Sequence, residues 1–212
     1  MDTTLLFVRH GQSEANTRHI FAGHLDAPLS SLGQKQAEAL ALYLDAFSIS
    51  AIYTSDLSRA ASTAEPTARR KGLTLQKDSR LREINAGIWE GKTFDALSPR
   101  ADFAVWLSDI GHAAPEGGET TEALLSRVLG ATREIAAKHV GETVLISTHA
   151  TPIRLLETVW RGLPLSAAKD IPWCGNASVT GVLYKEDGSF DILFRDVNDF
   201  LGTHASVLPK NV

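Results

Sequence analysis

The chain has 212 residues, of which 43% are hydrophobic and 22% are charged, as in an ordinary globular protein. The net charge of −4 argues against a nucleic-acid partner or a membrane-surface role, and the single cysteine, Cys174, cannot form an internal disulfide. No apolar run is long enough to span a bilayer and the first residues lack a signal-peptide pattern, so we expect a cytoplasmic protein with one domain over residues 1–212.

The N-terminal part alternates predicted strands with predicted helices. Residues 5–8 are continuously apolar, the pattern of a strand that is buried on both faces. After a polar loop, Ser30 or Ser31 caps a helix whose apolar residues recur at helical spacing. Residues 51–54 form a second predicted strand, and an alanine-rich helix follows from about residue 57 to residue 71.

The middle of the chain is the least regular part of the sequence. Gly72 ends the preceding helix, and a short strand is predicted near residues 73–75. Glycines and prolines are then frequent between residues 80 and 118, with room for one or two short helices. No linker isolates this region, so we expect a small helical lid or insertion at about residues 84–118 rather than a second domain.

The C-terminal part predicts a long helix, a buried strand, a helix and a hairpin. The first three lie at about residues 120–139, 143–147 and 152–161, and strands at 178–184 and 190–194 flank a Glu-Asp-Gly turn. The whole pattern predicts a three-layer α/β/α sandwich. Its central sheet should be mostly parallel, with one antiparallel edge strand.

Two of the buried strands each end in a histidine. His10 follows the first strand, and His149 follows the strand at residues 143–147. Ligands of open α/β sheets bind outside the carboxyl ends of the strands, so these two histidines can face each other across a crevice. A single histidine at such a place is more often structural. The pair, with Arg9 directly before His10, favours a functional site.

Two arginines are placed to bind an anion at the same edge. Arg9 and His10 are adjacent in an extended stretch and would point to opposite faces, unless the backbone bends at Gly11. Arg59 lies early in the helix that follows residues 51–54, and a surface salt bridge is its alternative interpretation. Because the guanidinium fork donates two parallel hydrogen bonds, both arginines suit a phosphate group.

A series of stretches resembles the motifs of the histidine phosphatase (phosphoglycerate mutase-like) superfamily, in particular its small bacterial phosphatases. The stretches are residues 6–16, 26–37, 53–64, 81–91, 115–120 and 147–150. The resemblance covers about residues 4–184 in unbroken order. One Arg-His-Gly triplet would be weak evidence, whereas this ordered series is specific.

The resemblance implies a covalent mechanism. His10 would be the nucleophile that becomes phosphorylated, since a neutral imidazole is a competent nucleophile near neutral pH. Arg9, Arg59 and His149 would hold the phosphoryl oxygens, where charge accumulates in the transition state. Three such donors can replace Mg²⁺, so neither a metal nor another cofactor is expected.

Glu83 resembles the proton donor of the superfamily, which protonates the departing alkoxide and later activates water. An ion pair with Arg80 or Arg82 is its alternative interpretation. The expected substrate-binding positions are Asn16, Phe21, Gly23 and Ala150.

The same set of residues serves phosphatases and mutases. Ala15 replaces the tryptophan that cofactor-dependent mutases carry before the asparagine, and Ala-Thr-Pro follows His149 where they have Gly-Asn-Ser. Residues 81–91 and 176–179 resemble the small bacterial phosphatases instead. The resemblance therefore favours a metal-independent phosphomonoesterase. A phosphoglycerate mutase and a non-catalytic phospho-ligand-binding module are the alternatives.

The substrate is expected to be a small phosphomonoester. Residues 117–120 resemble enzymes that act on α-ribazole phosphate, but broad-specificity phosphatases share this pattern. Trp89, Trp106 and Trp173 either line an apolar wall over the leaving group or pack in the core. A homodimer is only an expectation at the level of the family, and Cys174 is expected to be a small buried residue.

Overall fold

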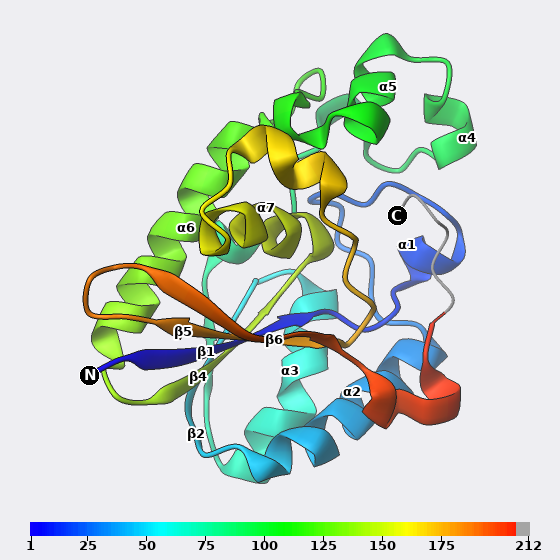
Figure 1. The fold of residues 1–212 in the computed structure, drawn as a ribbon. Coiled ribbons are helices and arrows are strands. Elements are labelled where there is room, and N and C mark those ends of the chain that lie inside the picture. Colours follow the sequence, from blue (N-terminus) through cyan, green and yellow to red (C-terminus); the bar gives the residue numbers. More distant parts are fainter. Residues whose placement is uncertain (207–212) are drawn as a thin grey trace.

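The computed structural model describes residues 1–206, and its centre is a six-stranded sheet in the order β3-β2-β4-β1-β5-β6 (Figure 1). The strands are β1 (Thr3–Arg9), β2 (Ile49–Thr54), β3 (Leu75–Lys77), β4 (Thr143–Thr148), β5 (Val179–Tyr184) and β6 (Phe190–Val197). The pairs β2–β3, β2–β4 and β1–β4 are parallel, whereas β5 is antiparallel to both β1 and β6. The predicted mostly parallel sheet with an antiparallel edge is confirmed, and a hairpin of two strands builds that edge.

Helices cover both faces of the sheet, which confirms the predicted three layers. Helices α2 (Ser31–Tyr43) and α3 (Ser58–Lys71) pack with Leu6 and Val8 of β1 in one apolar cluster. Leu5 and Phe7, which point to the opposite face because side chains alternate along a strand, pack with the helices of the other layer. Those helices are α6 (Thr121–Lys138) and α7 (Ala150–Trp160). Burial on both faces explains why β1 is apolar throughout.

The ends of the helices follow the local sequence. The Ser30 side chain accepts a hydrogen bond from the backbone N–H of Gly33 and caps α2. Gly72 ends α3 in the left-handed conformation, with φ of +66°. Helix α7 begins two residues before the predicted start, with His149 as its N-cap, and Pro152 is tolerated within the first turn. Strand β3 lies two residues beyond its predicted position.

Residues 84–118 have their own apolar cluster beside the three layers. They contain the short helices α4 (Phe94–Leu97) and α5 (Ala101–Ser108), which Figure 1 shows in green at the top of the molecule. Leu124 of α6 and Leu155 of α7 pack into the same cluster and anchor it to the sandwich. That this segment acts as a lid stays a prediction.

The remaining features concern the C-terminal part and the lone cysteine. The short helix α1 (Glu14–Thr17) follows β1 near the N-terminus. The last regular element of the described residues is a 3-10 stretch over Asp199–His204. The carbonyl of His204 accepts a hydrogen bond from the Gln36 side chain. Cys174 is free and buried, and burial raises the pKa of its thiol to about 12, so it is a packing residue as predicted. Within residues 1–206, none of the helices has the length and apolar character that crossing a membrane requires.

Candidate active site

A cavity that is partly open to solvent lies at the edge of the sheet where β1 ends. Most of the site residues predicted from the sequence line it: Arg9, His10, Asn16, Phe21, Gly23, Arg59, Glu83 and Ala150. His149 is fully buried and is not in the wall, but its ring packs edge-on against that of His10, with centroids 5.1 Å apart. The tertiary structure thus gathers predicted site residues that are up to 141 positions apart, from Arg9 to Ala150.

The His10 ring is held in one tautomer. Its Nδ1 lies 2.7 Å from the carbonyl oxygen of Gly11, and because a carbonyl only accepts, Nδ1 carries the proton. Nε2 therefore keeps its lone pair. Burial, followed by the charges of Arg59 and Arg9, holds the pKa of His10 well below its usual value. His10 is thus a neutral imidazole with Nε2 available as a nucleophile.

Close packing requires a glycine at position 11. Gly11 is not among the residues with positive φ, so the chain leaves β1 without a left-handed residue there. A Cβ at Gly11 would lie 2.8 Å from the carbonyl oxygen of Gly33 at the start of α2. Its N–H also donates to the Thr63 hydroxyl (2.9 Å). The loop can approach both helices only because residue 11 has no side chain.

The two arginines are buried and keep their charge for a ligand. Arg59 is only 1% exposed and donates to the carbonyls of Gly23 (2.8 Å) and Leu25 (2.9 Å), so its interpretation as a surface salt bridge is wrong. Arg9 donates to the Cys174 carbonyl (2.5 Å), and its buried Nε has no partner within the described part of the chain. Neither guanidinium is paired with a carboxylate of residues 1–206. Burial lowers both pKa values, yet an arginine stays protonated.

His149 offers a second unpaired donor. The Ser55 hydroxyl accepts from the N–H of Leu57 and lies 2.9 Å from Nε2 of His149. The tautomer in which this hydroxyl donates to Nε2 puts the ring proton on Nδ1, a buried atom that has no partner among the described residues. Burial and the charge of Arg59 hold the pKa of His149 well below its usual value. Nδ1–H of His149 and Nε–H of Arg9 are therefore oriented donors suited to an oxyanion.

Glu83 lies in irregular backbone, and its carboxylate forms no ion pair with the residues that the structure describes. One oxygen accepts the N–H of Ile84 (2.8 Å) and the other accepts that of Thr151 in the first turn of α7 (3.3 Å). Arg80 and Arg82 pair with other acidic residues. The alternative interpretation of Glu83, an ion pair with one of these arginines, is wrong. Its carboxyl group lines the cavity that His10 faces.

Asn16 and Asn176 form a polar link beside His10. Oδ1 of Asn16 accepts the N–H of Ser13 (3.0 Å), which leaves its amide NH₂ as a donor for a ligand. Nδ2 of Asn176 donates to the carbonyl of His10 (3.1 Å) and lies 3.4 Å from Oδ1 of Asn16. Asn176 was not among the predicted site residues. Its position three residues before the start of β5, the neighbour of β1, was the signal that could have identified it.

The far wall of the cavity is apolar and partly aromatic. Trp106 and Trp173 line it and stack on each other (centroids 6.1 Å apart), and the Arg154 guanidinium lies over Trp173. Trp89 is fully buried in the core of the 84–118 segment and donates to Asp102. Trp89 therefore packs in the core, and Trp106 belongs to the same cluster but also reaches the cavity with Trp173. That this wall covers the leaving group stays a prediction.

Further lining residues escaped prediction. They are Ser13, Ile20, Ala22, Phe94 and Thr151. Four of them are within a few positions of predicted residues, so proximity in the sequence was their only signal. Phe94 had none, because packing of α4 alone brings it to the cavity. Among the described residues, no group of three or more His, Cys, Asp or Glu side chains is arranged to hold a metal ion.

Buried neutral histidines make the folding stability depend on pH. In the folded protein the pKa values of His10 and His149 lie well below the usual value, whereas in the unfolded chain each has a pKa of about 6.5. Below that pH the unfolded state binds more protons, so their contribution is complete above about pH 6.5 and is lost as the pH falls. Each should add a slope that approaches about 1.4 kcal/mol per pH unit.

Urea unfolding between about pH 5 and about pH 8 measures this slope. His10→Asn should reduce it, whereas His19→Asn, at an exposed position, should not. An unchanged slope in His10→Asn would contradict the neutral buried state of His10.

Comparison with known proteins gives a consistent result. A family model described as the histidine phosphatase superfamily (branch 1) matches residues 5–196. Phosphoserine phosphatase 1 of Hydrogenobacter thermophilus is 32% identical over 200 residues, which cover 93% of this chain and 94% of the relative. A probable phosphoglycerate mutase GpmB of Cronobacter sakazakii is 31% identical, covering 84% of each chain. The solved structure of Bacillus stearothermophilus YhfR is similar with a TM-score of 0.88 and 34% identity, over 93% of this chain and 99% of that chain.

Proposed function

The chain belongs to branch 1 of the histidine phosphatase superfamily, and we propose that it hydrolyses small phosphomonoesters through a phosphorylated His10. The observation that carries this proposal is the neutral His10 imidazole, anchored through Nδ1. It lies in a cavity with two buried guanidinium groups that have no carboxylate partner in residues 1–206. The chain is a phosphoric monoester hydrolase.

In the first half-reaction, His10 takes the phosphoryl group from the substrate. Arg9, Arg59 and Nδ1–H of His149 hold the phosphoryl oxygens, while Nε2 of His10 attacks phosphorus and the bond to the leaving oxygen breaks. Glu83 donates a proton to that oxygen, so that an alcohol departs rather than an alkoxide.

In the second half-reaction, water hydrolyses the phosphohistidine. The Glu83 carboxylate now accepts a proton from water as the water oxygen attacks phosphorus, and the P–N bond breaks. Inorganic phosphate leaves, His10 returns to the neutral state, and Glu83 is again protonated. A module that only binds phosphate would not need a carboxyl group at this place.

Hydrolysis of p-nitrophenyl phosphate should continue at an unchanged rate after dialysis against EDTA. The positive charge that stabilises the transition state comes from Arg9 and Arg59, which chelation does not remove. Rapid acid-free quenching during turnover should trap a phosphoprotein that is labile to acid. Loss of activity with EDTA and recovery with a divalent metal would contradict this mechanism.

The walls of the cavity favour hydrolysis of esters with an apolar leaving group. Arg9 and Arg59 are needed at the phosphoryl end, and the lining contains no other lysine or arginine among the described residues. Phosphoglycerate carries a carboxylate that such a wall does not neutralise, which supports a phosphatase over the mutase alternative. Interconversion of 2- and 3-phosphoglycerate, stimulated by the bisphosphate, would support the mutase instead.

A screen of phosphorylated metabolites by phosphate release identifies the substrate. It should include phosphoserine, phosphoglycerate, α-ribazole phosphate and simple aryl and alkyl phosphates, with His10→Ala as the control for contaminating activity. The single cysteine fits a reducing compartment, and we propose the cytoplasm as the location of the reaction.

A further inference from the structure

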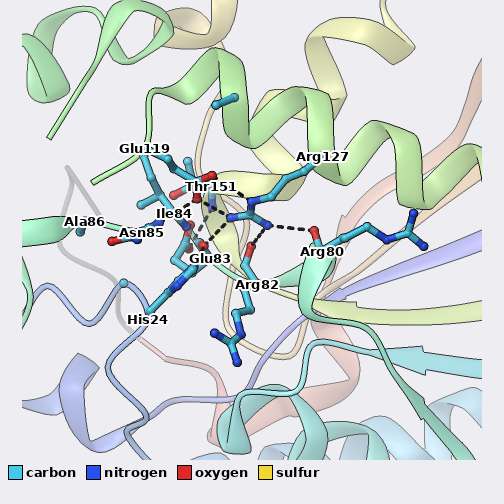
Figure 2. Close-up of polar contacts among 12 residues, drawn as sticks. His24, Arg80, Arg82, Glu83, Ile84, Asn85, Ala86, Glu119, Arg127 and Thr151 are labelled. Atoms are coloured by element: carbon cyan, nitrogen blue, oxygen red, sulfur yellow. Dashed lines mark hydrogen bonds and ion pairs between the residues drawn. The ribbon is translucent and has the colours of Figure 1, made fainter. Parts of the chain in front are cut away.

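Arg127 of α6 binds the backbone of the segment that carries Glu83 and the side chain of Glu119 (Figure 2). Nη1 donates to the carbonyls of Arg80 and Arg82, both at 2.8 Å. Nη2 donates to the carbonyl of Glu83 at 2.7 Å. The remaining two N–H groups bind the carboxylate of Glu119, at 2.5 Å from Nη2 and 2.9 Å from Nε. All five donors of the side chain are therefore satisfied.

Glu119 extends this clamp to the residues after Glu83. Its Oε1 accepts the N–H of Asn85 (2.8 Å), and its own N–H donates to the carbonyl of Asn85 (2.9 Å). Burial disfavours the charged carboxylate, but the hydrogen bonds from Arg127 and Asn85 prevail and hold the pKa of Glu119 below its usual value. The pair is half-buried, with 21% and 18% of the two side chains exposed, so water screens it only in part.

The backbone around Glu83 belongs to no secondary-structure element that would hold it in place. It lies between the 3-10 turns Ser79–Leu81 and Gly87–Trp89, outside any helix or strand, so its carbonyls find no partners in a ladder. Nε2 of His24 adds a second donor to the carbonyl of Glu83 (2.9 Å). The carboxylate itself is bound by backbone N–H groups of Ile84 and Thr151. Glu83 is thus fixed at both ends, its backbone by Arg127 and its carboxylate by α7.

We propose that Arg127, held in place by Glu119, is a positioning residue that keeps Glu83 within proton-transfer distance of the leaving oxygen. Arg127 does not line the cavity, so it acts through Glu83 and not on the phosphoryl group. The inference rests on the proposed function of Glu83 as acid and base. Lysine cannot replace arginine here, because an ammonium has three donors without the planar fork that reaches three carbonyls and a carboxylate.

The test compares leaving groups of different quality in Arg127→Lys. p-Nitrophenolate is a stable anion that leaves without a proton, whereas the alkoxide of 2-phenylethyl phosphate needs one. Misplacing Glu83 should therefore lower kcat/KM for the alkyl ester by about 10- to 100-fold, but by less than about threefold for the nitrophenyl ester. The inhibition constant of inorganic phosphate should stay the same, because its ligands are not touched.

Two further variants make the result decisive. Glu83→Gln gives the size of the selective loss that is expected when the acid itself is removed. Arg133 is an exposed arginine on α6, and Arg133→Lys should leave kcat/KM unchanged for both esters. Glu119→Gln should reproduce the selective loss in weaker form. It tests the positioning role of Arg127 even if Arg127→Lys does not fold.

Each outcome separates the inference from the proposed function. Equal losses for both esters in Arg127→Lys and Glu119→Gln, with a selective loss in Glu83→Gln, would overturn the positioning role alone. An absence of selectivity in Glu83→Gln would overturn the acid role of Glu83 and, with it, this inference. Selective losses in all three variants support both.

Discussion

Replacement of His10 by alanine should lower kcat/KM for p-nitrophenyl phosphate by at least about 10⁴-fold and remove the acid-labile phosphoprotein. Nε2 of His10 supplies the lone pair that the proposed reaction uses. The His149 ring cannot replace His10, because Nε2 of His149 faces the Ser55 hydroxyl. The measurement is steady-state hydrolysis together with radiolabel retained on the protein after a brief quench.

The same variant separates an enzyme from a binding module. Arg9 and Arg59 remain in His10→Ala, so inorganic phosphate should still bind and raise the melting temperature. Binding without turnover is the expected result. Hydrolysis that persists undiminished would contradict the proposed mechanism, whatever the binding data show.

Replacement of Arg59 by methionine should lower kcat/KM by about 10³-fold and move the acid limb of the pH profile to higher pH. After burial, the charge of Arg59 is the strongest influence that lowers the pKa of His10. Without it, His10 is protonated at a higher pH and its lone pair is lost sooner as the pH falls. The measurement is kcat/KM between about pH 4 and about pH 8.

Arg59→Lys is the matched control. Lysine keeps the positive charge but not the fork that reaches the carbonyls of Gly23 and Leu25, so the rate should fall while the acid limb stays near its original position. A methionine variant whose acid limb does not move would contradict the electrostatic role that the structure gives to Arg59.

The sequence was sufficient for most of the fold because its strongest signals are local. The apolar run at residues 5–8 is the centre of β1, and the Ser30 cap and the Gly72 stop bound the helices as expected. Strand β3 was misplaced by two residues, because pairing of Ile52 with Leu75 in the neighbouring strand sets its register. The three residues of β3 have little intrinsic preference for a strand.

The sequence by itself determined which residues reach the edge of the sheet. A residue that follows a parallel strand must lie at its carboxyl end, so the sequence places His10 and His149 at the same edge of the sheet. The pairing of β1 with β4 in the folded sheet then brings the two rings together. Glu83 lies in no strand or helix, and the tertiary structure decides its position through bonds from Arg127 to backbone carbonyls. Such bonds leave no pattern in the sequence, because every residue has a carbonyl and only the packing of α6 shows which ones the guanidinium meets. The same reason applies to the tryptophans of one apolar cluster, of which Trp106 also reaches the wall of the cavity and Trp89 does not.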